Sequence, residues 1–355
     1  MKTSAQGYRV AVVGASSLLG KELLNVLQER HFPFSSLVTF SDEEDEPELP
    51  ILDLREGPPV STLDENVTAS TLDFAFIAAR SRNMPSFLDP SLASQQGPLS
   101  CFVIDLSTAG PLREAAGPPF PQRRVCVPLL DRAFPVRETA EAGPGQVYIA
   151  ARPATMVISG LLLRLGARFL LKSAVAHVFA SASEVGSHGI EELQKQTVNL
   201  LSFQKIPRKV FGAQLAFNVL SRPCGTGASE LLALENGLRF QLQEYLQGRV
   251  PLPALRLLQV PVFHSLAVSL FVETDQPVAP EKAGEALKGE RIELRRHAQD
   301  SPTPVEVAGS DKILVDSVTA DSDRPSGLWI WAVADNLRLA AVNAVEIAES
   351  LRPQM

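Results

Sequence analysis

The sequence predicts an α/β protein in which a doubly wound parallel sheet is followed by an α+β domain. First, an apolar run at residues 8–13 leads through a Gly/Ser turn into leucines at helical spacing. Second, short apolar runs recur up to residue 150 with Pro- and Gly-containing loops between them, as buried parallel strands do. Third, longer helical patterns alternate with longer strands after about residue 153, which is typical of an α+β domain.

The first domain is expected to contain short buried strands and one well-marked helix. Leu19, Leu23 and Leu27 share a face if residues 18–30 are helical. The predicted strands are short apolar runs at residues 8–13, 36–40, 74–78, 102–105 and 147–150.

The second half of the chain is expected to combine helices with strands. Strands are predicted near residues 172–182 and 258–273. Residues 336–351 carry Ala, Leu, Val and Ile at three- and four-residue spacing, which predicts an amphipathic helix. The other predicted helices are residues 156–170, 189–201 and 229–246.

Composition excludes several classes of protein. The chain of 355 residues is 45% hydrophobic, which is enough to bury a substantial core. Its formal charge of −7 argues against binding to nucleic acid or anionic lipid. Charged residues interrupt the apolar stretch 158–180, so no membrane span is expected. Cys101, Cys126 and Cys224 are scattered and no signal-peptide pattern is visible; we therefore expect a cytoplasmic chain with free thiols and no metal site.

The turn after the first strand has features of a dinucleotide site. Glycines allow a tight backbone there, and the helix N-terminus offers N–H groups to a pyrophosphate. Ser17 stands where comparable dehydrogenases have glycine, and its Cβ is expected to crowd a phosphate. The acidic run at residues 42–48 would repel a 2′-phosphate, so NAD is favoured over NADP. The candidate cofactor-binding residues are Gly14, Ala15, Ser16, Ser17, Leu18 and Gly20.

Seven blocks, in order along the chain, match motifs of one enzyme family. Residues 8–34 resemble its nucleotide turn and helix, Val103-Ile-Asp-Leu-Ser-Thr108 resembles V-I-D-N-S-S, and Val125-Cys-Val-Pro-Leu129 resembles V-V-P-E. Ser183-Glu-Val-Gly-Ser-His-Gly-Ile-Glu-Glu-Leu193 resembles S-G-A-G-x-x-G-M-E-E-L. The remaining blocks are Leu215-Ala-Phe-Asn-Val219, Val260-Pro-Val-Phe263 and residues 331–349. Together they resemble the aspartate-semialdehyde dehydrogenases, and within that family the Usg-type paralogues that lack the catalytic cysteine.

This resemblance implies a domain plan. Residues 1–152 would form a Rossmann-like NAD(P)-binding-type domain, which a C-terminal helix within residues 333–355 completes. Residues 153–332 would form the α+β dimerisation domain. A homodimer is therefore expected.

The resemblance also assigns the catalytic positions. The family nucleophile is the cysteine of N-P-N-C-[ST], which corresponds to Ala151-Arg-Pro-Ala-Thr155 and places Ala154 at the cysteine. The acid/base histidine lies four residues after R-V-P-V, at Leu266. Neither side chain can do that chemistry. His264 lies two residues earlier and would share the face of Leu266 if both stood on one strand, so it is the candidate substitute base.

The cationic anchors of the family are replaced as well. Gln259 occupies the position of the arginine in R-V-P-V, and Pro111 that of the arginine in S-S-A-F-R. Leu231 occupies the position of the lysine before E-T. Glu235 is retained. A dianionic substrate would therefore be desolvated without its charged partners.

Two functions are compatible with these residues. The leading hypothesis is a homodimer without dehydrogenase activity that has a binding or regulatory role, sensing a nucleotide or pairing with a true dehydrogenase subunit. NAD or NADP would then bind weakly or not at all. The competing hypothesis is an oxidoreductase of amino-acid biosynthesis that transfers hydride between NAD(P) and an aldehyde or related substrate without the cysteine. It needs His188 or His264 as base, because only these lie in segments able to face the site.

Overall fold

A computed structural model describes residues 7–41, 72–79, 101–107, 123–135, 146–221, 228–295 and 301–351. Contacts divide the chain into two compact units: Met1–Ala151 with Ala340–Met355, and Arg152–Leu339. Among the helices so described, none is both long and apolar enough to cross a membrane.

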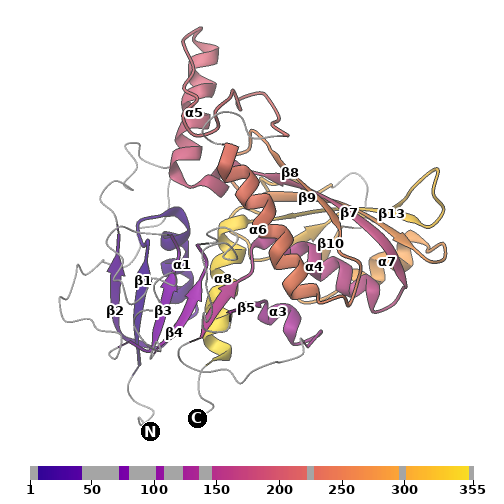
Figure 1. The fold of residues 1–355 in the computed structure, drawn as a ribbon, viewed down its shortest axis with the longest axis horizontal. Coiled ribbons are helices and arrows are strands. Elements are labelled where there is room, and N and C mark those ends of the chain that lie inside the picture. Colours follow the sequence, from indigo (N-terminus) through magenta and orange to yellow (C-terminus); the bar gives the residue numbers. More distant parts are fainter. Residues whose placement is uncertain are drawn as a thin grey trace. The chain divides into compact units, whose positions relative to one another are not determined.

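The first unit contains a six-stranded sheet in the order β2-β1-β3-β4-β6-β5, with every pairing parallel (Figure 1). The chain order reverses beside β1, which makes the carboxyl end of β1 a topological switch point. This sheet confirms the predicted doubly wound arrangement. Its strands are β1 (Tyr8–Val13), β2 (Phe34–Phe40), β3 (Phe74–Ile77), β4 (Phe102–Asp105), β5 (Arg123–Cys126) and β6 (Val147–Ala150). The helices are α1 (Leu18–Glu29), α3 (Pro128–Asp131) and most of α8 (Asn336–Ser350).

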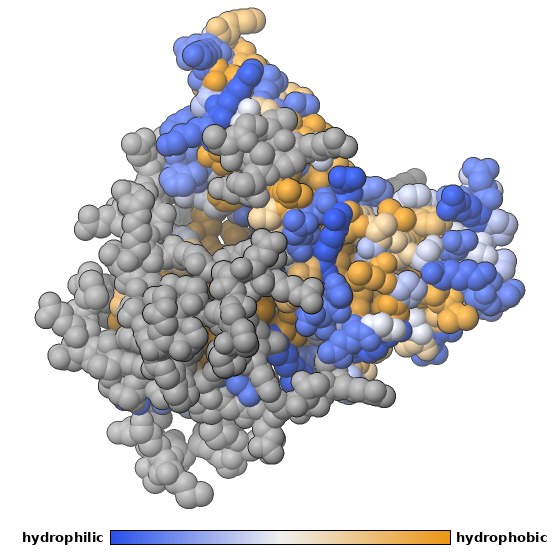
Figure 2. All heavy atoms as spheres, in the orientation of Figure 1, coloured by the Kyte–Doolittle hydropathy of each residue, from blue (hydrophilic) through white to orange (hydrophobic). Residues whose placement is uncertain are grey.

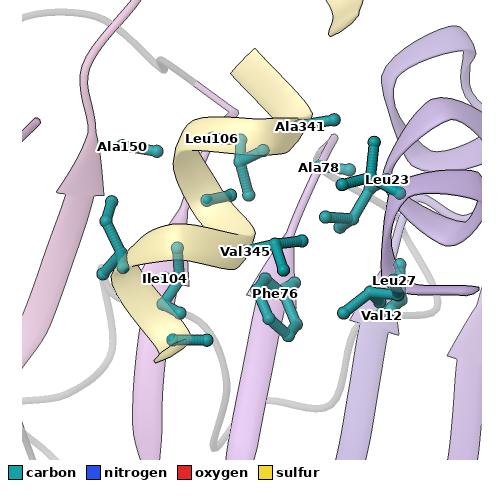
Figure 3. Close-up of a cluster of buried hydrophobic side chains, with 14 of the residues drawn as sticks. Val12, Leu23, Leu27, Phe76, Ala78, Ile104, Leu106, Ala150, Ala341 and Val345 are labelled. Atoms are coloured by element: carbon teal, nitrogen blue, oxygen red, sulfur yellow. The ribbon is translucent and has the colours of Figure 1, made fainter. Parts of the chain in front are cut away.

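The core of the first unit lies where α1 and α8 cover one face of this sheet. Val12 of β1 and Phe76 of β3 lie beneath Leu23 and Leu27 of α1, and Val345 of α8 packs beside them (Figure 3). All five side chains are buried. A helix from the far end of the chain therefore completes the cover of the N-terminal sheet.

The second unit contains a mixed seven-stranded sheet in the order β10-β11-β13-β9-β7-β8, with β12 paired to β13. The long central pairs, β7 with β9 and β9 with β13, are antiparallel. The strands are β7 (Leu171–Ala180), β8 (Ala254–Gln259), β9 (Leu266–Thr274), β10 (Ile292–Leu294), β11 (Ile313–Val315), β12 (Thr319–Ala320) and β13 (Gly327–Ala334). The helices are α4 (Pro153–Gly166), the 3-10 helix η4 (Ala182–Val185), α5 (Ser187–Leu201), α6 (Ala228–Leu246) and α7 (Pro280–Leu287).

Two boundaries differ from the sequence expectation. The strand expected at residues 258–273 is two strands, because a bend with Pro261 and a positive φ of 72° at Ser265 separates β8 from β9. Residues 333–339 fall in the second unit rather than the first. The reason is that β13 pairs with β9 along its whole length, up to Ala334.

Candidate functional site

The turn between β1 and α1 is held by two glycines. Gly14 has a φ of 73°, and a Cβ there would lie 2.7 Å from the Cβ of Ala79. Its N–H donates to the Phe40 carbonyl over 2.7 Å. A Cβ on Gly20 would collide with the Gly14 carbonyl oxygen. Both positions therefore need glycine for the strand-to-helix turn itself, whether or not a nucleotide binds.

Ser17 caps α1. Its hydroxyl donates to the Gly14 carbonyl over 2.7 Å and accepts the Gly20 N–H over 3.0 Å. The neighbouring N–H groups of Ala15 and Ser16 donate to Phe40 and to the Ser41 hydroxyl. Leu18 begins the helix and is buried. A pyrophosphate at this turn would therefore compete with the Ser17 oxygen for the Gly20 N–H, an obstacle beyond the predicted crowding by the Ser17 Cβ.

Ala154 lies in the first turn of α4 in the second unit, and its side chain is buried. Gln241 of α6 covers this helix start, because its Oε1 accepts the Arg152 N–H over 2.8 Å and the Thr155 hydroxyl over 3.0 Å. Pro153 occupies the first helical position. Proline has no backbone N–H, but an N–H at this position has no partner within the helix, so no hydrogen bond is lost.

Ala154 lines a small hollow within the second unit. The hollow has a cavity volume of about 10 Å³, which is roughly the room that one water molecule needs. Two charged residues line it, Arg152 and Glu184. The other lining residues are Pro153, Val178, Ala180, Leu234, Leu238 and Leu257.

Arg152 and Glu184 form a nearly buried ion pair, with Nη1 and Oε2 3.3 Å apart and side chains 11% and 17% exposed. Burial raises the pKa of the Glu184 carboxyl, while Arg152 and a hydrogen bond with Asn336 act in the opposite direction. Burial lowers the pKa of Arg152, and Glu184 opposes this. Each charge thus depends on the other for its compensation.

A buried polar network continues from this pair. The Asn336 Oδ1 accepts the Ser265 N–H over 2.9 Å, and its side chain bonds the Ser183 hydroxyl. Ser181 and Ser183 share a hydrogen bond of 3.0 Å. The network therefore ties the segment just after β7 to the residue before β9 and to the first residue of α8.

The proposed acid/base positions lie at the start of β9. Leu266 is the first residue of the strand and is 1% exposed. His264 lies in the bend before the strand, and Ser265 between them has a left-handed backbone. The expected sharing of one strand face is therefore wrong, because the alternation of side chains applies only within a strand.

His264 is half-buried outside the hollow at Ala154. Burial lowers the pKa of the His264 imidazole, and the carboxylate of Asp335 opposes this. Asp335 already accepts the N–H groups of Leu337 and Arg338 at the start of α8, as well as that of Gly309. His188 lies exposed in the first turn of α5.

Gln259, at one of the anchor positions, and the retained Glu235 both make hydrogen bonds within the fold. Gln259 is 2% exposed, and its amide donates to the Ala180 carbonyl over 2.9 Å. Glu235 accepts the Leu257 N–H over 2.8 Å and bonds Arg239 over 2.7 Å, so it fastens α6 to β8. Leu231 is half-buried on α6.

The two cysteines in the described ranges are buried in the first unit. Burial raises the pKa of Cys101 to about 11 and that of Cys126 to about 12, so both are thiols at neutral pH. The described residues contain no group of three or more His, Cys, Asp and Glu arranged to hold a metal ion. Cys224, Pro111 and the acidic run 42–48 lie outside the described residues.

Sequence reasoning did not assign a role to the Arg152–Glu184 pair, Gln241 or Asn336. Arg152 stands for the proline of N-P-N-C and Glu184 for the first glycine of S-G-A-G. The family motifs have uncharged residues at both positions. A positive and a negative residue at these two positions were therefore the sequence signal that could have predicted an ion pair.

Two family models match the chain. Residues 162–339 match the semialdehyde dehydrogenase, dimerisation domain. Residues 9–131 match the semialdehyde dehydrogenase, NAD binding domain. The chain therefore has an NAD-binding-type domain and a dimerisation-type domain.

Similar proteins are matched over nearly their whole length. An aspartate-semialdehyde dehydrogenase of Aquifex aeolicus is 28% identical over 352 residues, covering 97% of this chain and 98% of the relative. A USG-1 protein homolog of Pseudomonas aeruginosa is 29% identical over 362 residues, covering 98% of each. The solved structure of a probable aspartate-semialdehyde dehydrogenase from Pseudomonas aeruginosa has a TM-score of 0.78 at 26% identity, covering 98% of each chain. The chain belongs to the aspartate-semialdehyde dehydrogenase family.

Proposed function

We propose that this chain has lost dehydrogenase activity and acts as a homodimeric binding or regulatory protein. The observation that carries the proposal is Ala154, at the position that the resemblance assigns to the nucleophile. A methyl group cannot form a thiohemiacetal or an acyl-enzyme. Among the described residues, no thiol or imidazole lines the hollow at Ala154, so this part of the chain supplies no replacement nucleophile there.

The surrounding positions support the same proposal. Leu266 cannot transfer a proton. Gln259 cannot supply the charge of an arginine, and its amide is already bonded to the Ala180 carbonyl. The hollow itself has room for about one water molecule, and an ion pair forms part of its wall. A substrate with charged ends would find neither space nor free cationic partners in it.

The competing proposal is an oxidoreductase that transfers hydride without covalent catalysis. The observation in its favour is the carboxylate of Asp335 acting on His264, since an imidazole with an acidic neighbour is a common acid/base pair. Two observations weigh against it: burial lowers the pKa of His264 more than Asp335 raises it, and Asp335 already accepts three N–H groups.

Nucleotide binding is proposed to be weak or lost, despite the NAD-binding-type domain. The Ser17 hydroxyl occupies the Gly20 N–H, which is one of the donors that a helix N-terminus offers to a pyrophosphate. NAD is proposed over NADP because residues 42–48 are acidic. We further propose a cytoplasmic location, and an aspartate-semialdehyde dehydrogenase subunit as a second possible partner.

An activity assay tests the central proposal. The purified chain and an Ala154→Cys variant would be incubated with aspartate semialdehyde, phosphate and NADP, beside an active aspartate-semialdehyde dehydrogenase as positive control. We expect no turnover by either chain, since the variant restores the thiol but not the base at Leu266. Clear NADPH production by the unmodified chain would overturn the proposal.

A thermal-shift measurement tests the nucleotide part separately. A ligand that binds only the folded state raises the unfolding midpoint. We expect at most a small rise with millimolar NAD and none with NADP. A large rise with NADP would contradict both the weak binding and the preference for NAD.

A further inference from the structure

The carboxylate of Glu184 is held by donors from two other parts of the chain. The Arg152 guanidinium, which belongs to the residue before α4, has its Nη1 3.3 Å from the Glu184 Oε2. The side chain of Asn336, the first residue of α8, forms a hydrogen bond with the same carboxylate. One carboxylate therefore meets a cation and an amide, which is how a protein holds the carboxylate of a bound ligand.

The two donors are fixed by contacts that do not involve this carboxylate. The Arg152 N–H donates to the Gln241 Oε1 over 2.8 Å, which fixes the backbone that carries the guanidinium. The Asn336 Oδ1 accepts the Ser265 N–H over 2.9 Å, and its Nδ2 donates to the Ser183 hydroxyl over 3.0 Å. Asn336 is only 5% exposed. We therefore expect both donors to keep their places when the carboxylate is removed.

The hollow beside the ion pair has the composition of a small-ligand site. Its cavity volume is about 10 Å³, and apart from the ion pair its lining residues are apolar, among them Leu238 of α6. Apolar walls with a few converging polar groups are typical of sites that bind small molecules. Here a side chain of the protein itself lies where the charged end of a ligand would lie.

We infer that Arg152 and Asn336 form a carboxylate-binding site that the chain fills with its own Glu184, which keeps small free carboxylates out. The inference rests on the proposed loss of dehydrogenase activity, since an active enzyme would need this space for its substrate, and it adds what fills the space. Acetate is the ligand that matches the emptied site, because the Glu184 side chain beyond Cβ consists of one methylene and a carboxyl group.

The test empties the site and offers acetate to it. Glu184→Ala removes the methylene and the carboxyl group and leaves Arg152 and Asn336 in place. Unfolding midpoints are measured near neutral pH in sodium acetate and in sodium chloride of equal ionic strength. The signal is the fluorescence of the two tryptophans, which lie in the same unit as the site. A ligand that binds only the folded state raises this midpoint.

Three control variants separate the site from the rest of the surface. Hydrophilic side chains are spread over the visible surface of the second unit (Figure 2), so acetate also meets exposed groups, which the controls share. Arg152→Met combined with Glu184→Ala lacks the cation. Leu238→Ala enlarges the same hollow, because Leu238 is 2% exposed, but it keeps the ion pair. Glu184→Gln removes the charge while filling the space.

We expect acetate at concentrations well above its dissociation constant to raise the midpoint of Glu184→Ala by at least ~2 °C relative to chloride. The unmodified chain and the three controls should show no such rise, because their site is filled or lacks its uncompensated cation. If Glu184→Ala does not fold in chloride, the same comparison is made on the yield of refolding, which acetate should increase.

A Glu184→Ala chain that acetate neither stabilises nor helps to fold would overturn the inference. An equal rise in the unmodified chain or in the double variant would overturn it as well. The proposed loss of activity fails on a different result, which is turnover of aspartate semialdehyde by the unmodified chain. No turnover together with no response to acetate would leave the proposed function standing without this site.

Discussion

Two charged residues that lie 32 positions apart in the sequence meet beside Ala154. Arg152 and Glu184 each depart from the uncharged letters of the family motifs. Either charge alone would be buried without a counterion, whereas together they compensate each other over 3.3 Å. Each of the two charged residues therefore depends on the other for compensation of its charge.

This dependence predicts a non-additive response to substitution. Arg152→Met or Glu184→Leu alone should lower the free energy of unfolding by about 3–5 kcal/mol, because an uncompensated charge remains buried. The double variant should lose much less, since no charge is left. Urea denaturation of the three variants measures the coupling. If the double variant lost as much free energy of unfolding as the two single variants added together, the two residues would not be coupled.

His264 predicts a pH dependence of stability. Burial lowers the pKa of this imidazole in the folded chain, so the unfolded chain binds the proton more tightly. The contribution of His264 to stability is therefore present above the ordinary pKa of about 6.5 and is lost as pH falls from there through the lowered pKa.

The check is a series of unfolding midpoints between pH 8 and pH 5. His264→Asn should show a shallower fall on the acidic side than the unmodified chain. His188→Asn is the matched control, because His188 is exposed on α5. Identical curves for all three chains would rule out His264 as a source of the pH dependence.

At the scale of elements, the start of α1 combines two functions in one residue. Ser17 caps the helix by accepting the Gly20 N–H, and the same contact occupies a donor that a pyrophosphate would use. Helix stability and nucleotide affinity are therefore in competition at this position.

This competition predicts opposite effects in two Ser17 variants. Ser17→Ala should lower the free energy of unfolding by about 1 kcal/mol through loss of the cap. Ser17→Gly should cost only a few tenths of a kcal/mol and should free both the donor and the space for a phosphate. We expect a larger thermal shift with NAD for Ser17→Gly than for the unmodified chain. No difference in that shift would mean that Ser17 does not limit binding.

Much of the fold could be predicted from the sequence, and the reason is the pattern of burial. Strands β1, β4 and β6 match the expected ranges 8–13, 102–105 and 147–150, because buried parallel strands are apolar on both faces. The short strands β10 to β12 were not predicted, since two or three residues carry no periodicity. The break between β8 and β9 was missed because nothing in the residue type of Ser265 reveals its positive φ.

The candidate site could be predicted only in part. Ala154 and Leu266 follow from local motifs, which survive in the sequence at fixed spacing. The polar contacts beside Ala154 do not follow from local motifs, because Arg152, Glu184 and Asn336 come from three separate elements. Side-chain pairs of this kind are determined by the tertiary packing of the start of α4, η4 and the start of α8, which a one-dimensional pattern does not contain.

At the scale of the whole molecule, the two units carry separate optical reporters. The chain has two tryptophans, Trp329 and Trp331, and both lie on β13 in the second unit. The core of the first unit instead includes Tyr148 and the buried residue Ile347 of α8.

Ile347→Ala therefore predicts a selective loss of stability. The cavity left in the first unit should cost about 2–5 kcal/mol. We expect circular dichroism to show an earlier transition while the tryptophan fluorescence midpoint stays unchanged. If both signals shift equally, the two units unfold as one cooperative body.

The position of α8 in the chain determines when the first unit can finish folding. The strands of that unit are synthesised before residue 152, but the helix that covers their core with Val345 and Ile347 follows only after the entire second unit. At ordinary translation rates that interval is about 10–40 s. Throughout it, the part of the apolar face that α8 will cover stays open beside α1, so this chain should depend on ribosome-associated chaperones more than a protein whose N-terminal domain is complete in itself.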